Sequence, residues 1–279
     1  MTGRLHDLSE TADAFDSVAE TYDGPQGNNH LIQRMRQLTW ARIDQLVPRP
    51  SQLLDIGCGT GIDAQRFANL GHRVLATDWS PAMVQRAQAR AVASDGRIEA
   101  IRVGAQELDV LVPDRRGTID LAYSNFGPLN CVPDLGVTGR ALAELVRPGG
   151  HAVFTVIGRW CPWEIAHYAR QRRWKRLAVR FSRGMTPVNM NAHTIWTRYH
   201  TPRSFIREWN GGSSAGGAAQ WSVVSYEGLS TFVPPPYLTE LSTKRPGLSA
   251  RLERLDARTA AWPVARSMGD HFLIVLRRT

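Results

Sequence analysis

The feature that most constrains the fold is a cluster of glycines directly after a short apolar segment. Residues 53–64 read LLDIGCGTGIDA, in which the apolar run leads into Gly57, Gly59 and Gly61. A glycine lacks the Cβ that would block a tight backbone turn or the close approach of a ligand. The apolar spacing over 62–70 predicts a helix immediately afterwards. A strand, a glycine turn and a helix in this order form a nucleotide-type site at the carboxyl edge of a parallel sheet.

The spacing of the glycines discriminates between classes of nucleotide. The dinucleotide fingerprint is G-x-G-x-x-G, and its third glycine would fall at Ile62. Here Asp55 leads the glycines and Gly61 comes one position early. An acidic side chain beside the turn repels a pyrophosphate and suits a ligand that carries an ammonium group. The spacing therefore disfavours an NAD-dependent enzyme, while a plain strand-to-helix turn is the simpler alternative.

Length and composition predict one large α/β domain with an insertion. The chain has 279 residues, of which 43% are apolar and 21% charged. No run reaches the ~20 apolar residues of a membrane helix, and residues 1–15 lack the apolar core of a signal peptide. Cys58, Cys131 and Cys161 form no C-x-x-C pair, so we expect free thiols and no metal site. We expect a cytoplasmic protein with no membrane partner.

The net charge is +9, from 34 Lys and Arg against 25 Asp and Glu. A basic chain can bind nucleic acid, anionic lipid or acidic substrates, and the total charge does not choose between them. The nine Trp residues must either fill a core or line a pocket.

Further strand and helix units follow the glycine turn. Residues 72–78 form a short apolar run that ends in Asp78, roughly 20 residues past the glycines, where an acid accepts hydrogen bonds from ribose hydroxyls. Ser80 and Pro81 then begin a helix, and because Ser80 serves as the cap, the ribose role is favoured for Asp78. Strands are predicted at 98–104, 119–126 and 151–157, with a helix at 135–146 between the last two. This regular alternation predicts a doubly wound, mostly parallel sheet.

Five features occur in an order typical of one family. They are the acid-led glycine turn, Asp78, the AQEL loop at 105–108, Asn125 and the Arg-Pro-Gly-Gly turn at 147–150. Over about residues 50–157 the chain thus resembles the class I S-adenosylmethionine-dependent methyltransferases of the small-molecule type. The resemblance implies a Rossmann-like fold, S-adenosylmethionine as cofactor and methyl transfer by in-line displacement, for which the protein mainly supplies positioning.

The resemblance also implies a cofactor site. The family often has an Asp where this chain has Gly104, so the adenine contact is expected from the backbone near Ala105 or from the Gln106 amide. The segment FDSVAETYD resembles a lid that folds over the cofactor, although a peripheral helix that caps the sheet is equally compatible. Arg36 is expected to pair with the methionine carboxylate, with a solvated surface position as the alternative. The candidate cofactor-binding residues are Tyr22, Arg36, Asp55, Gly57, Cys58, Gly59, Asp78, Trp79, Ala105, Gln106, Asn125 and Phe126.

The regular alternation ends at residue 158. We expect 158–200 and 228–268 to be insertions, one after strand 5 and one before the last strand, that together cap the cofactor site. The predicted organisation is therefore an N-terminal lid at 1–47, a cofactor-binding core at 48–157, and a region at 158–279 that holds the cap and the last two strands. One arginine-rich helix is expected over 160–183.

The cap also carries the expectation for the acceptor. Aromatic residues gather in an insertion that has little core to fill, which favours a pocket for a bulky hydrophobic or aromatic small molecule, such as a natural-product intermediate methylated on O, N or C. An RNA methyltransferase and a non-catalytic S-adenosylmethionine-binding subunit are the alternatives, although nucleic acid is disfavoured. No catalytic residue is predicted, and the oligomeric state is left open. The aromatic residues are Trp160, Trp163, Trp174, Trp196, Tyr199 and Trp209, and the histidines near the cap are His30, His167, His193 and His200.

Overall fold

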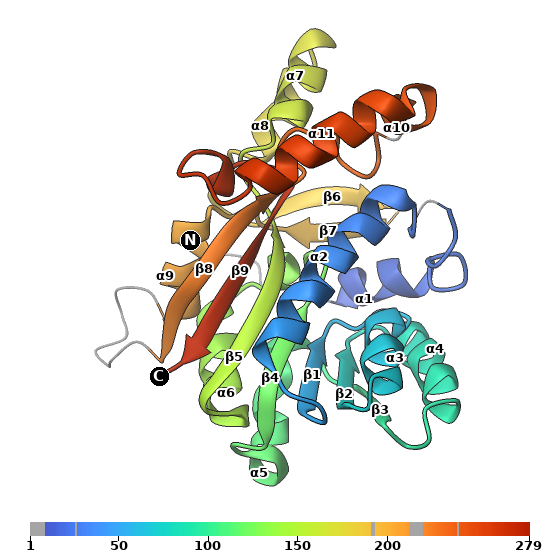
Figure 1. The fold of residues 1–279 in the computed structure, drawn as a ribbon, viewed down its shortest axis with the longest axis vertical. Coiled ribbons are helices and arrows are strands. Elements are labelled where there is room, and N and C mark those ends of the chain that lie inside the picture. Colours follow the sequence, from blue (N-terminus) through green and yellow to red (C-terminus); the bar gives the residue numbers. More distant parts are fainter. Residues whose placement is uncertain (1–8, 26, 191–192, 212–219, 239) are drawn as a thin grey trace.

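The computed structural model describes residues 9–25, 27–190, 193–211, 220–238 and 240–279. A seven-stranded sheet of order β3-β2-β1-β4-β5-β9-β8 forms its centre, and helices cover both faces (Figure 1). The first five strands pair in parallel, while β9 runs antiparallel to both β5 and β8. The predicted doubly wound, mostly parallel sheet is confirmed.

The core half follows the predicted order of units. The Ser80 side chain accepts a hydrogen bond from the Met83 amide at 3.1 Å, and Pro81 occupies the first helical position, so α4 begins where the sequence indicates. The elements are β1 (Gln52–Ile56), α3 (Ile62–Asn69), β2 (Arg73–Asp78), α4 (Pro81–Val92), β3 (Ile98–Arg102), η1 (Ala105–Leu111), α5 (Val112–Arg115), β4 (Ile119–Ser124), η2 (Pro128–Cys131), α6 (Leu135–Leu145) and β5 (Val146–Ile157).

Two N-terminal helices, α1 (Ser9–Asp16) and α2 (His30–Leu46), precede the sheet. Two carboxylates, Asp16 at the end of α1 and Asp23 in the residues that follow it, fix this N-terminal part of the chain to the core. Asp16 accepts from the Ala82 amide at 3.0 Å, at the start of α4. Asp23 accepts from the Thr60 hydroxyl at 2.6 Å and from Arg90 at 2.8 Å. The N-terminal segment is therefore held beside the glycine turn.

The second half contains α7 (Pro162–Arg170), α8 (Trp174–Val179), β6 (Thr186–Met190), β7 (His193–Thr197), α9 (Pro202–Trp209), β8 (Trp221–Leu229), α10 (Glu240–Lys244), α11 (Pro246–Thr259), η4 (Ala265–Ser267) and β9 (His271–Arg278). The prediction of one helix over 160–183 is wrong. The helix ends at Arg170 and a second begins at Trp174, because Arg172 between them adopts the left-handed conformation with φ +55°.

The aromatic residues after β5 do not all belong to a cap. Trp209 is 1% exposed, and its ring centroid lies 4.9 Å from that of Phe154 and 5.5 Å from that of Phe205. Helix α9 thus packs against the central sheet and completes its core. The expectation that this region has little core to fill is wrong for Trp209. Among the described helices none has the length and apolar character needed to cross a bilayer.

Candidate functional site

A cavity of about 270 Å³ lies at the carboxyl ends of the parallel strands. The residues after β1, β2, β3 and β4 form one side of it, and α1 with the β6–β7 hairpin forms the other. Nine of the twelve predicted cofactor-binding residues contribute to its walls, whereas Arg36, Asp55 and Cys58 do not. The nine are Tyr22, Gly57, Gly59, Asp78, Trp79, Ala105, Gln106, Asn125 and Phe126.

The glycine turn needs glycine for two separate reasons. Gly57 and Gly59 both have positive φ, at +72° and +54°, which costs an ordinary residue backbone strain. A Cβ on Gly57 would also meet the Pro128 ring at 2.4 Å. A Cβ on Gly59 would meet only the Tyr22 ring, at 3.6 Å, so a larger side chain there would enter the cavity.

Asp78 is fixed in the cavity wall by backbone amides. The Gly59 amide donates to Oδ2 at 2.8 Å, and the Ser80 amide donates to Oδ1 at 2.9 Å. Burial raises the pKa of Asp78, while the amides of Ser80 and Gly59 act in the opposite direction by stabilising the charged form. The carboxylate is therefore held in one orientation and keeps lone pairs for a ligand hydroxyl.

A buried polar cluster forms one end of the site and is centred on Asp63, in the first turn of α3. Asp63 pairs with Arg36 at 2.7 Å and accepts hydrogen bonds from the Trp40 indole at 2.7 Å and the Asn125 amide at 2.8 Å. Arg36 is 7% exposed, so the alternative of a solvated surface arginine is wrong. We call Arg36, Trp40, Asp63 and Asn125 the polar end. The sequence prediction missed Asp63, although an acid in the first turn after a glycine loop is a signal at a helix N-terminus.

The polar end has hydrogen-bonding capacity that the described part of the chain does not use. The Nε of Arg36 and the Oδ1 of Asn125 are both buried without a partner among the described residues. The Arg36 guanidinium also lies 4.9 Å from the centre of the Phe126 ring, which lines the cavity. Buried polar groups without partners are costly. A neutral acceptor in the cavity wall, Asn125, and a cationic donor behind it, Arg36, are therefore presented together.

Two other predicted residues lie beneath the turn rather than in the walls. Asp55 is 1% exposed, and burial, followed by the charge of Asp63, raises its pKa well above the ordinary value. Burial, followed by the charge of Asp55, likewise raises the pKa of the Cys58 thiol, which stays neutral. A direct cofactor contact by Asp55, Cys58 or Arg36 stays a prediction.

Gln106 occupies the space that a side chain at residue 104 would take. A Cβ on Gly104 would lie 2.6 Å from the Gln106 Nε2, and this nitrogen is buried without a described partner. The neighbouring Ala105 carbonyl already accepts from the Thr138 hydroxyl at 2.9 Å. The Gln106 amide therefore has an unused donor for the adenine base, while the Ala105 carbonyl is already engaged.

The opposite part of the cavity, which we call the hairpin end, is mainly apolar. Burial raises the pKa of Cys131 to about 11 and that of Tyr199 to about 12, so both stay protonated near neutral pH. None of the four histidines near the cap is in the cavity walls as far as the chain is described, and burial lowers the pKa of His200 to about 3. The hairpin end consists of Cys131, Val132, Ile157, Val188, Ile195, Thr197 and Tyr199.

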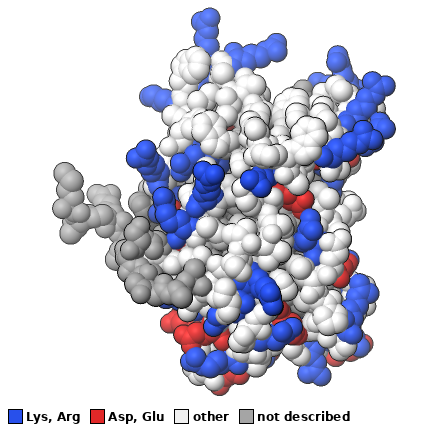
Figure 2. All heavy atoms as spheres, turned by 60° about the vertical axis from the view of Figure 1, so that its left-hand side comes forward, with Lys and Arg blue, Asp and Glu red and all other residues white. Residues whose placement is uncertain are grey.

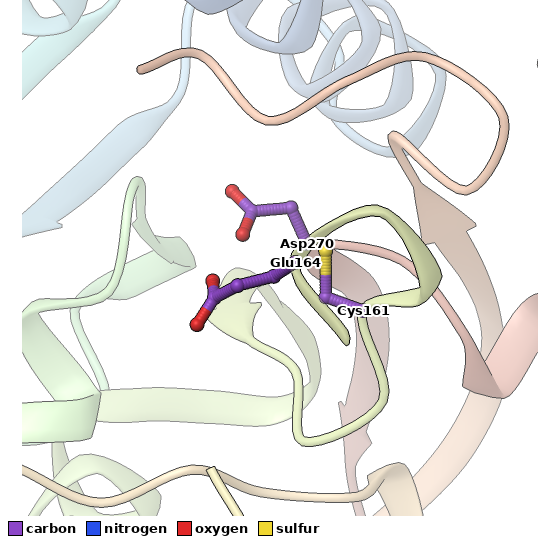
Figure 3. A group of neighbouring side chains, drawn as sticks. All are labelled: Cys161, Glu164 and Asp270. Atoms are coloured by element: carbon purple, nitrogen blue, oxygen red, sulfur yellow. The ribbon is translucent and has the colours of Figure 1, made fainter. Parts of the chain in front are cut away.

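A second cluster of potential ligands lies behind Tyr199. Figure 3 shows Cys161, Glu164 and Asp270 as neighbouring side chains, and one ligand atom of each lies within 4.8 Å of the others. One nitrogen of Arg180 lies 2.5 Å from Glu164 and 2.6 Å from Asp270, in the place that a metal ion would take. Burial alone would raise the pKa of Asp270, but His271 and Arg180 hold it below the ordinary value. This cluster is therefore a buried ion pair, with Arg180 also 5.1 Å from the Tyr199 ring.

Comparison with known proteins places the fold. Residues 53–150 match the family model of the methyltransferase domain. This match supports a methyltransferase domain over that part of the chain. The ubiquinone biosynthesis O-methyltransferase of Xanthomonas axonopodis pv. citri is 31% identical over 151 residues, which are 53% of this chain and 60% of that protein. The chain thus spans about 60% of the length of this curated relative.

Solved structures match over a larger part of the chain. The [4+2]-cyclase SpnF gives a TM-score of 0.62 at 17% identity, with 96% of this chain and 94% of that one covered. The 1,6-didemethyltoxoflavin-N1-methyltransferase of Burkholderia thailandensis, solved with its substrate and S-adenosylhomocysteine, gives 0.57 at 17% identity and covers 100% and 92%. At this identity the likeness shows the fold alone. Because one of the two is named a cyclase, the activity has to be argued from the site.

Proposed function

We propose that this protein binds S-adenosylmethionine in the cavity and transfers its methyl group to a small, largely apolar acceptor. The observation that carries the proposal is the unused donor and acceptor at the polar end, Arg36 Nε and Asn125 Oδ1. When bound, the cofactor supplies an electrophilic sulfonium methyl group. The family supports this choice of cofactor.

The residues present fit an amino acid at the polar end. A carboxylate is matched by the spare N–H of Arg36, because guanidinium groups form strong charge-assisted bonds to carboxylates. An ammonium group is matched by the free Asn125 oxygen. Asp63 anchors both side chains through its two oxygens, so it acts as the positioning residue for the pair.

The residues also fit a nucleoside on the other side of the glycine turn. The fixed Asp78 carboxylate suits the ribose hydroxyls, as acids at the end of the second strand do in related folds. Trp79 offers an aromatic face and Gln106 an unused amide for the base. A side chain in place of Gly59 would obstruct the path between the two parts.

The chain promotes transfer by positioning and by exclusion of water. The N-terminal segment is anchored through Asp16 and Asp23, and Tyr22 forms part of the wall, so we propose that residues 1–47 act as the lid. Within the described walls, Asp78 is the one carboxylate and no histidine is present. The proposal therefore rests on orientation of the acceptor against the methyl group, which can account for a large part of the barrier lowering.

The hairpin end supports the choice of acceptor class. Its walls are mainly aliphatic, with Tyr199 as the aromatic surface, which favours a hydrophobic or aromatic small molecule. The relative from Xanthomonas is named an O-methyltransferase of ubiquinone biosynthesis, which favours oxygen among the three possible acceptor atoms. Residues 48–157 would then hold the cofactor, and the cap within 158–279 would hold the acceptor.

The test is titration calorimetry with S-adenosylmethionine and S-adenosylhomocysteine on the full chain. We expect one site, and we expect Gly59→Val to abolish measurable binding because its side chain would enter the cavity at a strained φ. Circular dichroism checks that the variant is folded. If the parent binds neither compound, or if the folded variant binds like the parent, the proposed function is wrong.

A further inference from the structure

A second hollow lies outside the cofactor site, between α7 and the segment from α11 to η4. Its volume is about 850 Å³, and its walls are almost entirely apolar. On one side Trp163 and Ala166 of α7 form the wall, and on the other Leu252 of α11, Trp262 and Val264 do so. Trp262 is 62% exposed and Val264 is 71% exposed. Apolar surface of this kind is unusual on a molecule without a partner.

The pattern of α11 explains why one of its faces is left open. Ser249 and Asp256 are buried against the body of the molecule. The apolar positions Leu248, Leu252 and Leu255 recur at helical spacing beside that buried face, and Leu248 and Leu255 are exposed. Helix α11 therefore presents an apolar stripe that the described chain covers only in part.

The hollow is held in a fixed shape by hydrogen bonds. Asp256 accepts from the Phe232 amide at 2.8 Å and from the Thr231 and Val233 amides at 3.2 Å each. On the facing helix, the Trp163 indole donates to the Phe232 carbonyl at 2.7 Å. Both walls are thus tied to the same loop, so the hollow is a preformed groove.

Positive charge surrounds this groove. Arg251, Arg254 and Arg258 are exposed and follow one edge of α11 at spacings of three and four residues. The described acids of this part of the molecule are engaged, because Glu164 pairs with Arg180 and Glu253 with Arg34. Figure 2 shows Lys and Arg around the top of the molecule and few Asp or Glu there. The other exposed cations, at the end of α7 and along α8, are Arg170, Arg172, Arg173, Lys175 and Arg176.

We propose that this groove binds an acidic amphipathic helix of a partner protein. A long, concave, apolar surface suits the apolar face of a helix. The arginine row would meet acidic residues along the edge of that helix, which gives specificity and speeds association. A second copy of this chain is a poor occupant, because its net charge is +9. An anionic bilayer favours protruding apolar side chains, whereas here most of the apolar groups line a hollow.

The probe is a fluorescein-labelled peptide of 14 residues, as long as α11, with Leu at helical spacing and Glu elsewhere. Fluorescence anisotropy with the full chain should show saturable binding that weakens as salt rises. Two control peptides are used. One has the same composition in scrambled order, and the other has Lys in place of Glu. We expect at least about tenfold weaker binding of either control. Equal binding of the scrambled peptide, or no binding of the acidic one, would overturn the proposal.

Variants locate the binding to the groove. Ala166→Glu adds an acid at an exposed position of α7, and Trp262→Ala removes the exposed indole. Each variant should bind the acidic peptide with about tenfold lower affinity. The triple change Arg251→Glu, Arg254→Glu and Arg258→Glu should do the same and remove the salt dependence. The matched control changes Arg140, Arg203 and Arg207 to Glu, which are exposed cations on α6 and α9, and should bind like the parent.

The same variants distinguish the other possible occupants. Anionic vesicles of phosphatidylglycerol and mixed tRNA are tested by sedimentation and by filter binding. If either is retained by the parent and lost in the groove variants while the peptide does not bind, the surface belongs to that class and the proposal is wrong. Titration of S-adenosylmethionine into the groove variants should match the parent, which separates this result from the proposed function.

Discussion

The two ends of the cavity depend on different physical interactions. The polar end holds Arg36, Trp40 and Asn125 on the oxygens of Asp63 through contacts of 2.7 to 2.8 Å. The hairpin end has aliphatic walls and three polar side chains, Thr197, Cys131 and Tyr199, and the raised pKa values of Cys131 and Tyr199 keep them neutral. Directional bonds can specify one ligand, whereas an apolar wall mainly specifies size and shape. Under the proposed function, this difference fits a fixed cofactor at the polar end and an adaptable acceptor at the hairpin end.

Removal of Asp63, the centre of the polar end, is the strongest test of this difference between the two ends. Asp63→Ala leaves the Arg36 guanidinium buried without its counter-ion, so we expect the free energy of unfolding to fall by about 3 kcal/mol. Urea denaturation measures it. Glu99→Ala is the control, because its pair with Arg115 is exposed and should contribute less than about 1 kcal/mol. Similar losses in the two variants would mean that the polar end is not a buried network.

Asp78→Ala tests the nucleoside side of the cavity. The fixed carboxylate would no longer meet the ribose, and we expect S-adenosylmethionine affinity to fall at least tenfold, or about 1.4 kcal/mol. Calorimetry on the folded variant measures the change, with Asp114→Ala, an exposed acid of α5, as the control. Unchanged affinity would exclude Asp78 from the cofactor site.

Deletion of residues 1–26 tests whether the N-terminal segment closes the cavity over both its polar end and its hairpin end. The segment packs through Val18 and Ala19 on Met83 and contributes Tyr22 to the wall, but its described residues, 9–25, add no strand to the sheet. We expect a folded protein whose cofactor affinity is lower by about threefold to tenfold. Asp23→Ala, which removes one hydrogen-bond acceptor of Arg90 and that of the Thr60 hydroxyl, should give a smaller loss in the same direction. A truncated protein with full affinity and turnover would remove the lid from the proposal.

The smallest effect is expected at the hairpin end. Val188→Ala shortens a half-buried aliphatic side chain of β6 that touches the cavity. Cofactor affinity should stay within about twofold of the parent, whereas Asn125→Ala at the polar end should lower it by about tenfold. The two titrations are read side by side. A tenfold loss in Val188→Ala would place the cofactor at the hairpin end and reverse the comparison.

Much of the core could be predicted because its signals are local. The positive φ of Gly57 and Gly59, the Ser80 cap and the order of strands up to β5 all follow from neighbours in the sequence. The break at Arg172 could not, because no glycine or proline marks it. Trp209 was placed in the cap because nothing in its own segment indicates that α9 packs against Phe154.

The sequence by itself determined the sheet, the glycine turn, the position of Asp78 and the resemblance to the methyltransferase family, since each depends on residue type and short-range spacing. Tertiary structure alone decided which side chains meet. Arg36, Asp63 and Asn125 come from three separate elements and pair only because the carboxyl ends of β1 and β4 lie next to each other beneath α2. The same holds for the β6–β7 hairpin over the cavity, because long-range contacts depend on the packing of whole elements and leave no periodic trace in the chain.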